Sequence, residues 1–405
     1  VTYSSELFQR LYRNVLSIPE LLFFLGCIIN VLFSNKHKIL NNISLGFITS
    51  IMLLTREDTI WTYIVLIILY GYKIIKYIKQ KNKIQIINIL ISLFPIFIII
   101  INLNIISYIN YKHYNIYTYN ELNDTSFERA YKKVLEIKDD KKIEKVAIPR
   151  TTFEKLTKNS KLLKITEEEL EEFYNKFQNE DKEIDNGNVV WYFRNLVNRH
   201  NKFKDGEEAR KFYNKLSLEL DYLFETGVFE KEMVLPSTYL YMPTKKELFE
   251  IPKSIIKSII YTTTYNQVKT LTKSDVESYD NQKYDDKIKS YSLSYKDYRN
   301  SANIPKNNPI FIEIIRIIYK YFTIIFSFVA LFIYLKNIKK FDNLNIIIDI
   351  ILISYLVIIF GISYNNATSF PSIRYSYLAN IYILQNLFVL LNIYRLYLKK
   401  HIRGK

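Results

Sequence analysis

Two short polar stretches interrupt the apolar ends of this chain, and both hold residues that could do chemistry. The first, Thr55-Arg56-Glu57-Asp58-Thr59, places a guanidinium beside two carboxylates between two apolar runs. A guanidinium presents a fork of donors that matches phosphate oxygens. Carboxylates can orient a hydroxyl group or ligate a hard divalent cation. An active-site role for Arg56, Glu57 and Asp58 is therefore one interpretation of the stretch.

A structural role is the alternative for the same stretch. Thr55 stands three residues ahead of Asp58 and before an apolar run, which is the pattern of a helix N-cap. Asp58 would also suit the positive end of a helix dipole. Charges at the edge of the hydrocarbon layer are costly unless they are used. Both interpretations fit the sequence.

The second polar stretch, Ser372-Ile373-Arg374-Tyr375, follows Pro371 and opens the last apolar run. Arg374 could clamp a phosphate with Tyr375 beside it, and anchoring to a lipid headgroup is the alternative. An arginine predicted on the outer side runs against the usual cytoplasmic bias of basic residues. That bias favours a functional role for Arg374 as much as a structural one.

Apolar runs long enough to cross a membrane must position these residues, since a spanning helix needs about 20 mostly apolar residues. The second run is short and needs protein-covered flanks, and the fourth contains Pro95, which neighbouring helices can accommodate. The seven predicted spans are Val15 to Phe33, Ile43 to Leu54, Ile60 to Ile78, Ile84 to Ile109, Ile310 to Leu335, Leu344 to Ile362 and Tyr375 to Leu398.

Basic residues give these spans an orientation, because Lys and Arg in short loops favour the cytoplasmic side. They alternate consistently along the chain, which places the middle region outside and accounts for much of the net charge of +16. The net charge is therefore no evidence for a nucleic-acid partner, and we expect none. The cytoplasmic residues are Lys36, Lys38, Lys73, Lys76, Lys79, Lys81, Lys83, Lys336, Lys339, Lys340, Lys399, Lys400, Arg403 and Lys405. We predict a multi-pass protein of the bacterial inner membrane.

The mean hydropathy of −0.03 is an average over apolar ends and a polar middle. We therefore predict three parts, which are spans in 1–110, an extracytoplasmic domain in 111–309, and spans with a cytoplasmic tail in 310–405. Helical spacing predicts a mostly α-helical domain. Its expected elements are helices at Phe127 to Ile137, Thr166 to Phe177, Val189 to His200 and Gly206 to Phe224, a short strand at Val146 to Pro149, and a partly irregular segment at Gln267 to Asn300. The fold class is mainly α, a transmembrane bundle with a large inserted domain.

Several chemistries find no support in the residues. The single Cys27 excludes a disulfide framework, and the four histidines are never at metal-ligand spacing, so no His- or Cys-based metal site is expected. Neither a Gly-rich phosphate loop nor a nucleophile elbow occurs. Because the chain begins at Val1 without a signal-peptide pattern, we expect that a segment precedes it.

One set of motifs resembles a known family. Leu53 to Asp58 with Trp61 resembles the Leu-Thr-Arg-Glu-(Glu/Asp)-x-x-Trp stretch of uncharacterised bacterial membrane proteins related to polyprenyl-phosphate-dependent glycosyltransferases of the GT-C type. A Cys often found before the family's Gly is absent at Thr226. Tyr192 and Phe193 stand where the family's Trp-Ala-Leu-Arg stretch has Ala and Leu. The other matching positions are Phe127, Ala130, Tyr131, Val134, Val146, Pro149, Ser160, Trp191, Arg194, Phe212, Tyr213, Leu216, Glu219 and Gly227.

The resemblance implies a membrane-embedded enzyme that moves a sugar from a polyprenyl-phosphate donor to an envelope acceptor on the outer face. Arg56 and Arg374 would then hold the phosphate, and Glu57 or Asp58 would orient the acceptor or hold a divalent cation. The catalytic carboxylate of such enzymes generally lies in a first outer loop, which here would precede Val1. The rival interpretation is a non-catalytic envelope protein that binds a protein or glycan. Transport is a third, disfavoured because few charged residues lie deep within the predicted spans.

Overall fold

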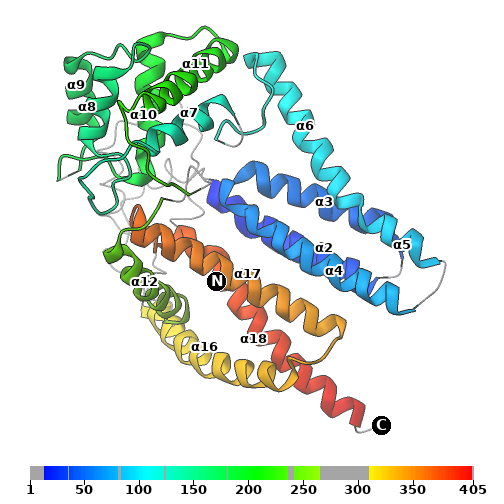
Figure 1. Cartoon of the computed structure of the whole chain (residues 1–405). Coiled ribbons are helices and arrows are strands. Elements are labelled where there is room, and N and C mark those ends of the chain that lie inside the picture. Colours follow the sequence, from blue (N-terminus) through cyan, green and yellow to red (C-terminus); the bar gives the residue numbers. More distant parts are fainter. Residues whose placement is uncertain are drawn as a thin grey trace, which may run out of the picture. The chain divides into compact units, whose positions relative to one another are not determined.

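We describe the protein from a computed structural model that covers residues 13–34, 36–80, 84–122, 125–179, 181–235, 241–264 and 310–403. The described part is mainly helical (Figure 1). Within these ranges the only β-pairing consists of two isolated bridges, one of which joins Ile143 to Val146. The predicted strand at Val146 to Pro149 is therefore wrong, because Pro149 lies directly before a helix. The segment Gln267 to Asn300 lies outside the described residues.

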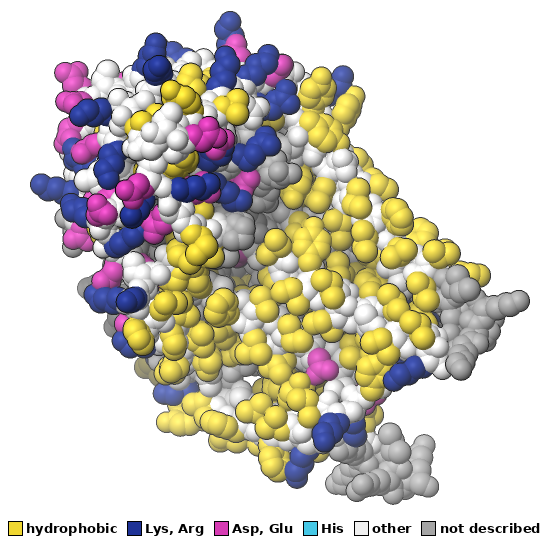
Figure 2. Space-filling model, viewed as in Figure 1, with side chains coloured by type: hydrophobic (Ala, Val, Ile, Leu, Met, Phe, Trp, Pro, Cys, Tyr) yellow, Lys and Arg dark blue, Asp and Glu magenta, His cyan; other side chains and the backbone are white. Residues whose placement is uncertain are grey.

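The chain divides into two compact units. The apolar unit comprises Val1–Ile100, Ile255–Ile362 and Ile373–Lys405, and the polar unit comprises Ile101–Ser254 and Ser363–Ser372. Hydrophobic side chains gather over α2 to α6 and α16 to α18, whereas charged side chains gather over α8 to α11 (Figure 2). The predicted three-part division at residues 110 and 309 stays a prediction.

Within the described residues, seven segments are long and apolar enough to cross a membrane, which agrees with the seven predicted spans. These apolar segments are Leu16–Phe33, Lys38–Thr55, Asp58–Lys79, Ile87–Tyr114, Ile314–Asn337, Asn343–Thr368 and Tyr377–Leu398. The helices that carry these segments are α2 (Arg13–Phe33), α3 (Lys38–Thr55), α4 (Trp61–Gln80), α5 (Ile84–Ser92), α6 (Phe94–Tyr114), α16 (Ile310–Asn337), α17 (Asn343–Thr368) and α18 (Tyr375–Arg403).

Helix α3, the shortest predicted span, has the protein-covered flank that its prediction required. Asn42 near its start is 1% exposed and accepts a hydrogen bond of 2.6 Å from the hydroxyl of Tyr70 on α4. One turn later, Gly46 lets α3 approach α6. A Cβ at Gly46 would lie 2.8 Å from Cα and from the carbonyl oxygen of Pro95. Small residues permit this close backbone contact between membrane helices.

The fourth predicted span is two helices rather than one. It breaks at Leu93, between α5 and α6. Pro95 has no backbone N–H and its ring clashes with the carbonyl four residues earlier, which interrupts a helix. The turn is closed instead by shorter-range bonds, from Leu93 N to Leu90 O at 3.0 Å and from Ile96 N to Leu93 O at 3.0 Å.

Charged residues also occur inside the later spans, and two of them have polar partners on neighbouring helices. Arg395 on α18 is 4% exposed and donates to Asn345 Oδ1 on α17 at 2.7 Å. Asp349 on α17 accepts a hydrogen bond of 2.9 Å from Tyr334 on α16. The expectation of few charges within the spans therefore missed a polar network that joins α16, α17 and α18.

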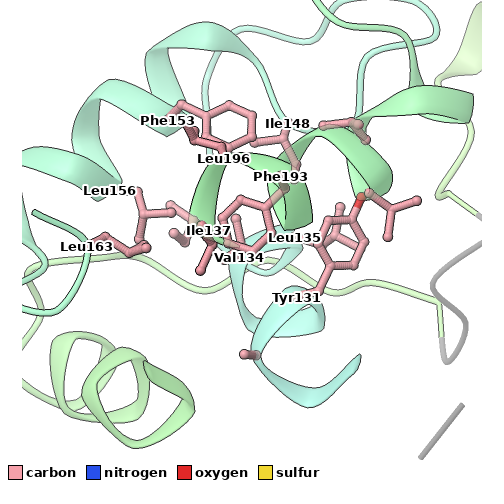
Figure 3. Packing of buried hydrophobic residues seen from close by; sticks show 14 of the residues in the cluster. Tyr131, Val134, Leu135, Ile137, Ile148, Phe153, Leu156, Leu163, Phe193 and Leu196 are labelled. Carbon is pink, nitrogen blue, oxygen red and sulfur yellow. The ribbon is translucent and has the colours of Figure 1, made fainter. Parts of the chain in front are cut away.

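The polar unit has a conventional hydrophobic core. It is built from α7 (Ser126–Leu135), α8 (Arg150–Asn159), α9 (Glu167–Phe177), α10 (Asn186–Asn201) and α11 (Gly206–Glu225). Tyr131 of α7, Phe153 of α8 and Phe193 of α10 meet in its centre (Figure 3), and none of the three is more than 1% exposed. The four helices predicted for this region are confirmed as α7, α9, α10 and α11, and α8 was not predicted.

The segment Ser363–Ser372, which comprises the end of α17 and the first residues after it, belongs to the polar unit. The Asn186 side chain donates to Thr368 O at 2.6 Å, and the Asn366 side chain donates to Ser254 Oγ at 3.0 Å. Ser254 lies in α12 (Lys245–Thr264), a helix that was not predicted. In its second half, α12 contacts α18, where the hydroxyl of Tyr382 donates to Tyr261 O at 3.2 Å.

Replacing Gly46 with alanine should loosen the contact between α3 and α6. The added Cβ would meet backbone atoms of Pro95 that cannot rotate away, and overpacking of this kind typically costs about 1–3 kcal/mol. We expect Gly46→Ala to lower the melting temperature of the purified protein in detergent. Gly71→Ala is the matched control, because a Cβ at Gly71 meets nothing within 4 Å. Equal stability of the two variants would contradict the close contact.

Candidate functional site

The predicted Arg56 stretch forms the tight connection between α3 and α4. Helix α3 ends at Thr55, and a 3-10 turn, η1 (Glu57–Ile60), leads into α4 at Trp61. Thr59 closes the connection, since its hydroxyl lies 2.8 Å from Met52 O and 2.7 Å from Arg56 O. The connection is thus a fixed element with buried hydrogen bonds rather than an open loop.

Arg56 and Asp58 pair with each other in this connection. The Arg56 side chain is 9% exposed and the Asp58 side chain is 57% exposed. Arg56 donates from Nε to Asp58 Oδ1 at 2.8 Å, and its Nη2 pairs with Asp58 Oδ2. This two-pronged contact is the geometry in which guanidinium also holds phosphate. Sequence analysis identified both residues but not their pairing.

The helix-cap interpretation of Thr55 is wrong. Its hydroxyl lies 2.8 Å from Ile51 O and 2.7 Å from Oε1 of Glu20 on α2. Thr55 is the last residue of α3, and the cap position of the following turn, at Arg56, has no side-chain hydrogen bond. The threonine therefore faces a carboxylate on a neighbouring helix instead of starting a new one.

Glu20 is the residue that sequence analysis missed. It lies in α2 within an apolar span and is 7% exposed. Its Oε1 has Thr55 as a partner, Arg56 interacts with it electrostatically, and its Oε2 is buried without a hydrogen-bond partner among the described residues. Glu20 is near one end of the apolar segment Leu16–Phe33, where a charge costs less than the roughly 3 kcal/mol that it costs at the centre of a membrane helix. A carboxylate retained at such a cost with a free oxygen is a functional candidate.

A signal for Glu20 was present in the sequence. It is the only acidic residue in the predicted span Val15 to Phe33, and ionisable residues inside spans mark functional sites by default. Periodicity alone could not pair it with Thr55, because the two residues are 35 positions apart. That pairing comes from the antiparallel packing of α2 against α3.

Apolar and polar neighbours shape the surroundings of Glu20. Trp61 is 5% exposed and its ring meets Phe24 of α2 edge to face, with centroids 6.0 Å apart. Ser17 precedes Glu20 by three residues and therefore shares its side of α2. The Ser17 hydroxyl donates to Asn380 Oδ1 of α18 at 3.4 Å. The cluster of Glu20, Thr55, Arg56 and Asp58, here called the Arg56 cluster, thus lies beside a contact with α18.

Arg374 and Tyr375 lie where α18 begins. The Arg374 side chain is exposed, and its carbonyl accepts from Leu378 N at 3.0 Å. Six residues of helix, or about 9 Å of rise, separate Arg374 from Asn380, the residue that meets Ser17. The side chains of Tyr375 and of Glu57 lie outside the described part of the structure. Convergence of Arg374 with the Arg56 cluster stays a prediction.

A divalent cation finds no prepared site in this arrangement. Within the described ranges, no group of three or more His, Cys, Asp and Glu side chains could hold a metal ion. Both oxygens of Asp58 already contact Arg56. The described residues of the cluster therefore fit a role in binding an anion and moving a proton better than a role in metal ligation.

Comparison of the chain with models of protein families, with curated proteins and with solved structures gave no match in any of the three. The resemblance to GT-C type enzymes consequently rests on the sequence motifs alone.

Replacing Glu20 with methionine should test whether its carboxylate serves stability. Methionine has a similar volume, and exchanging an incompletely paired buried polar group for an apolar one is often neutral or stabilising. We expect Glu20→Met to keep or raise the melting temperature in detergent. Asn42→Met is the contrasting control, because it leaves the Tyr70 hydroxyl without its partner. A loss of stability in Glu20→Met equal to that of the control would make Glu20 a structural residue.

Proposed function

We propose that this protein is an integral glycosyltransferase of the bacterial inner membrane, which transfers a sugar from a polyprenyl-phosphate donor to an envelope acceptor. The observation that carries the proposal is Glu20, a buried carboxylate beside the buried guanidinium of Arg56, with one oxygen that has no hydrogen-bond partner in the described part of the chain. An acid–base group next to an anion-binding group, both in apolar surroundings, is what transfer from a lipid phosphate requires.

The orientation of the helices supports an outward-facing site. Basic residues lie in the last turns of α2, α4, α16 and α18 or shortly after them, and basic residues at such ends favour the cytoplasm. They are Lys36, Lys38, Lys76, Lys79, Lys336, Lys339, Lys340, Lys399 and Lys400. Arg56 lies at the opposite end of α3 from Lys38. With the basic ends inside, the Arg56 cluster and the polar unit are extracytoplasmic.

The proposed reaction needs one displacement at the sugar. The acceptor oxygen forms a bond to C1 of the sugar, the bond from C1 to the phosphate oxygen breaks, and the acceptor proton passes to the Glu20 carboxylate. Arg56 stabilises the charge that develops on the leaving phosphate. A positioned general base typically contributes 10²–10⁴-fold, and an electrostatic donor of this kind about 10²–10³-fold.

Asp58 and Arg374 complete the proposed site. Asp58 holds the Arg56 fork in place when no donor is bound, and its exposed side chain can turn away when phosphate takes its place. Glu57 orients the acceptor, and Arg374 with Tyr375 contacts the donor headgroup from the start of α18. In this scheme, Asp58 is a positioning residue rather than the base.

A second candidate function is a non-catalytic envelope protein whose polar unit binds a partner. It is favoured by a cavity of about 480 Å³ in the polar unit, which is lined by four charged side chains. The two candidates differ in whether substitutions at the Arg56 cluster abolish a reaction.

Cysteine labelling tests the orientation. Glu168→Cys in α9 should react with a membrane-impermeant maleimide in intact spheroplasts, because Glu168 is exposed in the polar unit. Lys339→Cys, after α16, should react only once the membrane is opened. The native Cys27 is buried, so unsubstituted protein provides the background. The reverse pattern would place the polar unit in the cytoplasm and remove the outer-face reaction.

Sugar transfer tests the reaction itself. In membranes that contain the protein, transfer of labelled sugar from a polyprenyl-phosphate donor should fall at least 100-fold in Glu20→Gln and in Arg56→Gln. We expect smaller losses in Asp58→Asn, Glu57→Gln and Arg374→Ala.

Glu168→Gln is the control for these variants, because this exposed glutamate lies in the polar unit. All variants are compared at matched expression. Absence of transfer by wild-type protein across a donor panel would favour the envelope-binding function, whereas full activity of Glu20→Gln would keep the enzyme and remove Glu20 as its base.

A further inference from the structure

The polar unit contains a cavity that the proposed reaction does not use. It has a volume of about 480 Å³ and lies among the end of α6, the segment after it, α10 and the start of α11. Pockets that hold small molecules commonly measure about 300–1,000 Å³. Its lining includes Asn110, Tyr119, Glu121, Arg194, Asn198 and Phe203.

Hydrogen bonds fix the wall formed by the segment after α6. The Asn110 side chain donates to Thr118 O at 2.8 Å, and the Tyr117 hydroxyl donates to Asn104 Oδ1 at 2.6 Å. The Asn115 side chain donates to Asp205, the N-cap of α11, at 2.9 Å. Because these contacts exist without a ligand, binding here would need little ordering of the wall.

Gly206 allows the opposite wall to come close. A Cβ at this first residue of α11 would lie 2.6 Å from Tyr114 O and 2.8 Å from Ile116 Cβ. The start of α11 therefore rests directly on the backbone that leaves α6. Phe203, just before this point, is held by ring contacts with Phe212 and Tyr213 at 5.3 and 6.2 Å between centroids.

A charged pair in the cavity is incompletely satisfied. Glu121 and Arg194 form an ion pair at 2.5 Å, and burial raises the pKa of Glu121 while Arg194 opposes that rise. The Nε of Arg194 and the hydroxyl of Tyr213 are buried without a partner in the described structure. Tyr213 is 1% exposed, and its hydroxyl interacts electrostatically with both members of the pair. Of these two groups only Arg194 lines the cavity, and an unpaired buried group of this kind costs about 1–3 kcal/mol.

The chemistry of the lining points to the class of ligand. Two cationic side chains, Arg194 and Lys202, are matched by two anionic ones, Glu121 and Asp205, so the cavity has no net attraction for a highly charged anion. Amides and the ion pair offer donors and acceptors together, and Tyr119 and Phe203 offer apolar ring surfaces. A compact molecule with hydroxyl groups and an apolar face complements this mixture.

We propose that this cavity binds a neutral saccharide of one or two rings. The sugar hydroxyls bond with the Glu121–Arg194 pair and the amide of Asn198, and a ring face packs on Tyr119 or Phe203. The inference rests on the polar unit alone and goes beyond the transfer reaction, since it holds whether or not the Arg56 cluster is catalytic.

Binding to the full chain in detergent micelles tests this proposal. The probes are methyl glycosides of glucose, galactose and N-acetylglucosamine with their disaccharides, measured by saturation-transfer NMR and calorimetry. We expect at least one probe to bind, with affinity reduced tenfold or more in Tyr119→Ala and in Asn198→Ala. Both side chains are at least partly exposed, so these variants should fold.

Tyr222→Ala is the matched control, because this tyrosine of α11 is 62% exposed and does not line the cavity. It should bind as wild type does. Three results would overturn the proposal: no binding of any glycoside to folded wild type, binding unchanged in both cavity variants, or inorganic phosphate binding more tightly than every glycoside. None of these measurements includes a polyprenyl donor, so their failure is separate from failure of the transfer reaction.

Discussion

Helices in hydrocarbon gain little from apolar contact with one another, because lipid tails are as apolar as leucine side chains. Close packing and polar contacts must therefore hold the apolar unit together, and the structure has both. Gly46 brings α3 onto the backbone at Pro95, Tyr70 bonds Asn42 between α4 and α3, and Arg395 bonds Asn345 between α18 and α17. The same constraint makes an incompletely paired group stand out. Glu20 joins α2 to α3 through only one of its oxygens.

The polar unit follows the opposite rule. Its helices are amphipathic and bury aromatic side chains such as Tyr131, Phe153 and Phe193 in one core, as expected where water drives apolar surfaces together. Charged residues there lie at the surface, in ion pairs, or buried against backbone N–H groups, as Glu183 and Glu247 do. Glu121 and Arg194 differ from these residues, because they form an ion pair that lines a cavity. The Nε of Arg194 is buried there without a hydrogen-bond partner among the described residues.

Sequence analysis captured what depends on local periodicity and hydropathy. Length and apolarity sufficed to find seven spans, and spacing of apolar residues sufficed for α7, α9, α10 and α11. Sequence analysis missed the elements whose formation depends on tertiary packing. Helix α12 contains Pro252 and a polar side with Ser258 and Thr262, so neither a soluble nor a membrane pattern identified it.

The residues of the candidate site were likewise found where a local pattern sufficed and missed where packing between helices brings them together. Arg56 and Asp58 were found because a charged stretch between apolar runs is conspicuous, and they are two residues apart. Thr55 was misread as a helix cap because its true partner, Glu20, lies on another helix. The contact between Ser17 and Asn380 joins positions 363 residues apart, which no local pattern in a single sequence can reveal.

The break at Leu93 affects how the chain meets bilayers of different thickness. Helix α6 alone has 21 residues, about 30 Å of rise, which already matches an average hydrocarbon layer. The nine residues of α5 are therefore surplus length. A rigid helix of that total length would have to tilt strongly or distort the lipid. Because α5 ends at Ser92 and α6 begins at Phe94, the two helices need not share one inclination, so hydrophobic mismatch can be absorbed at one end of the segment.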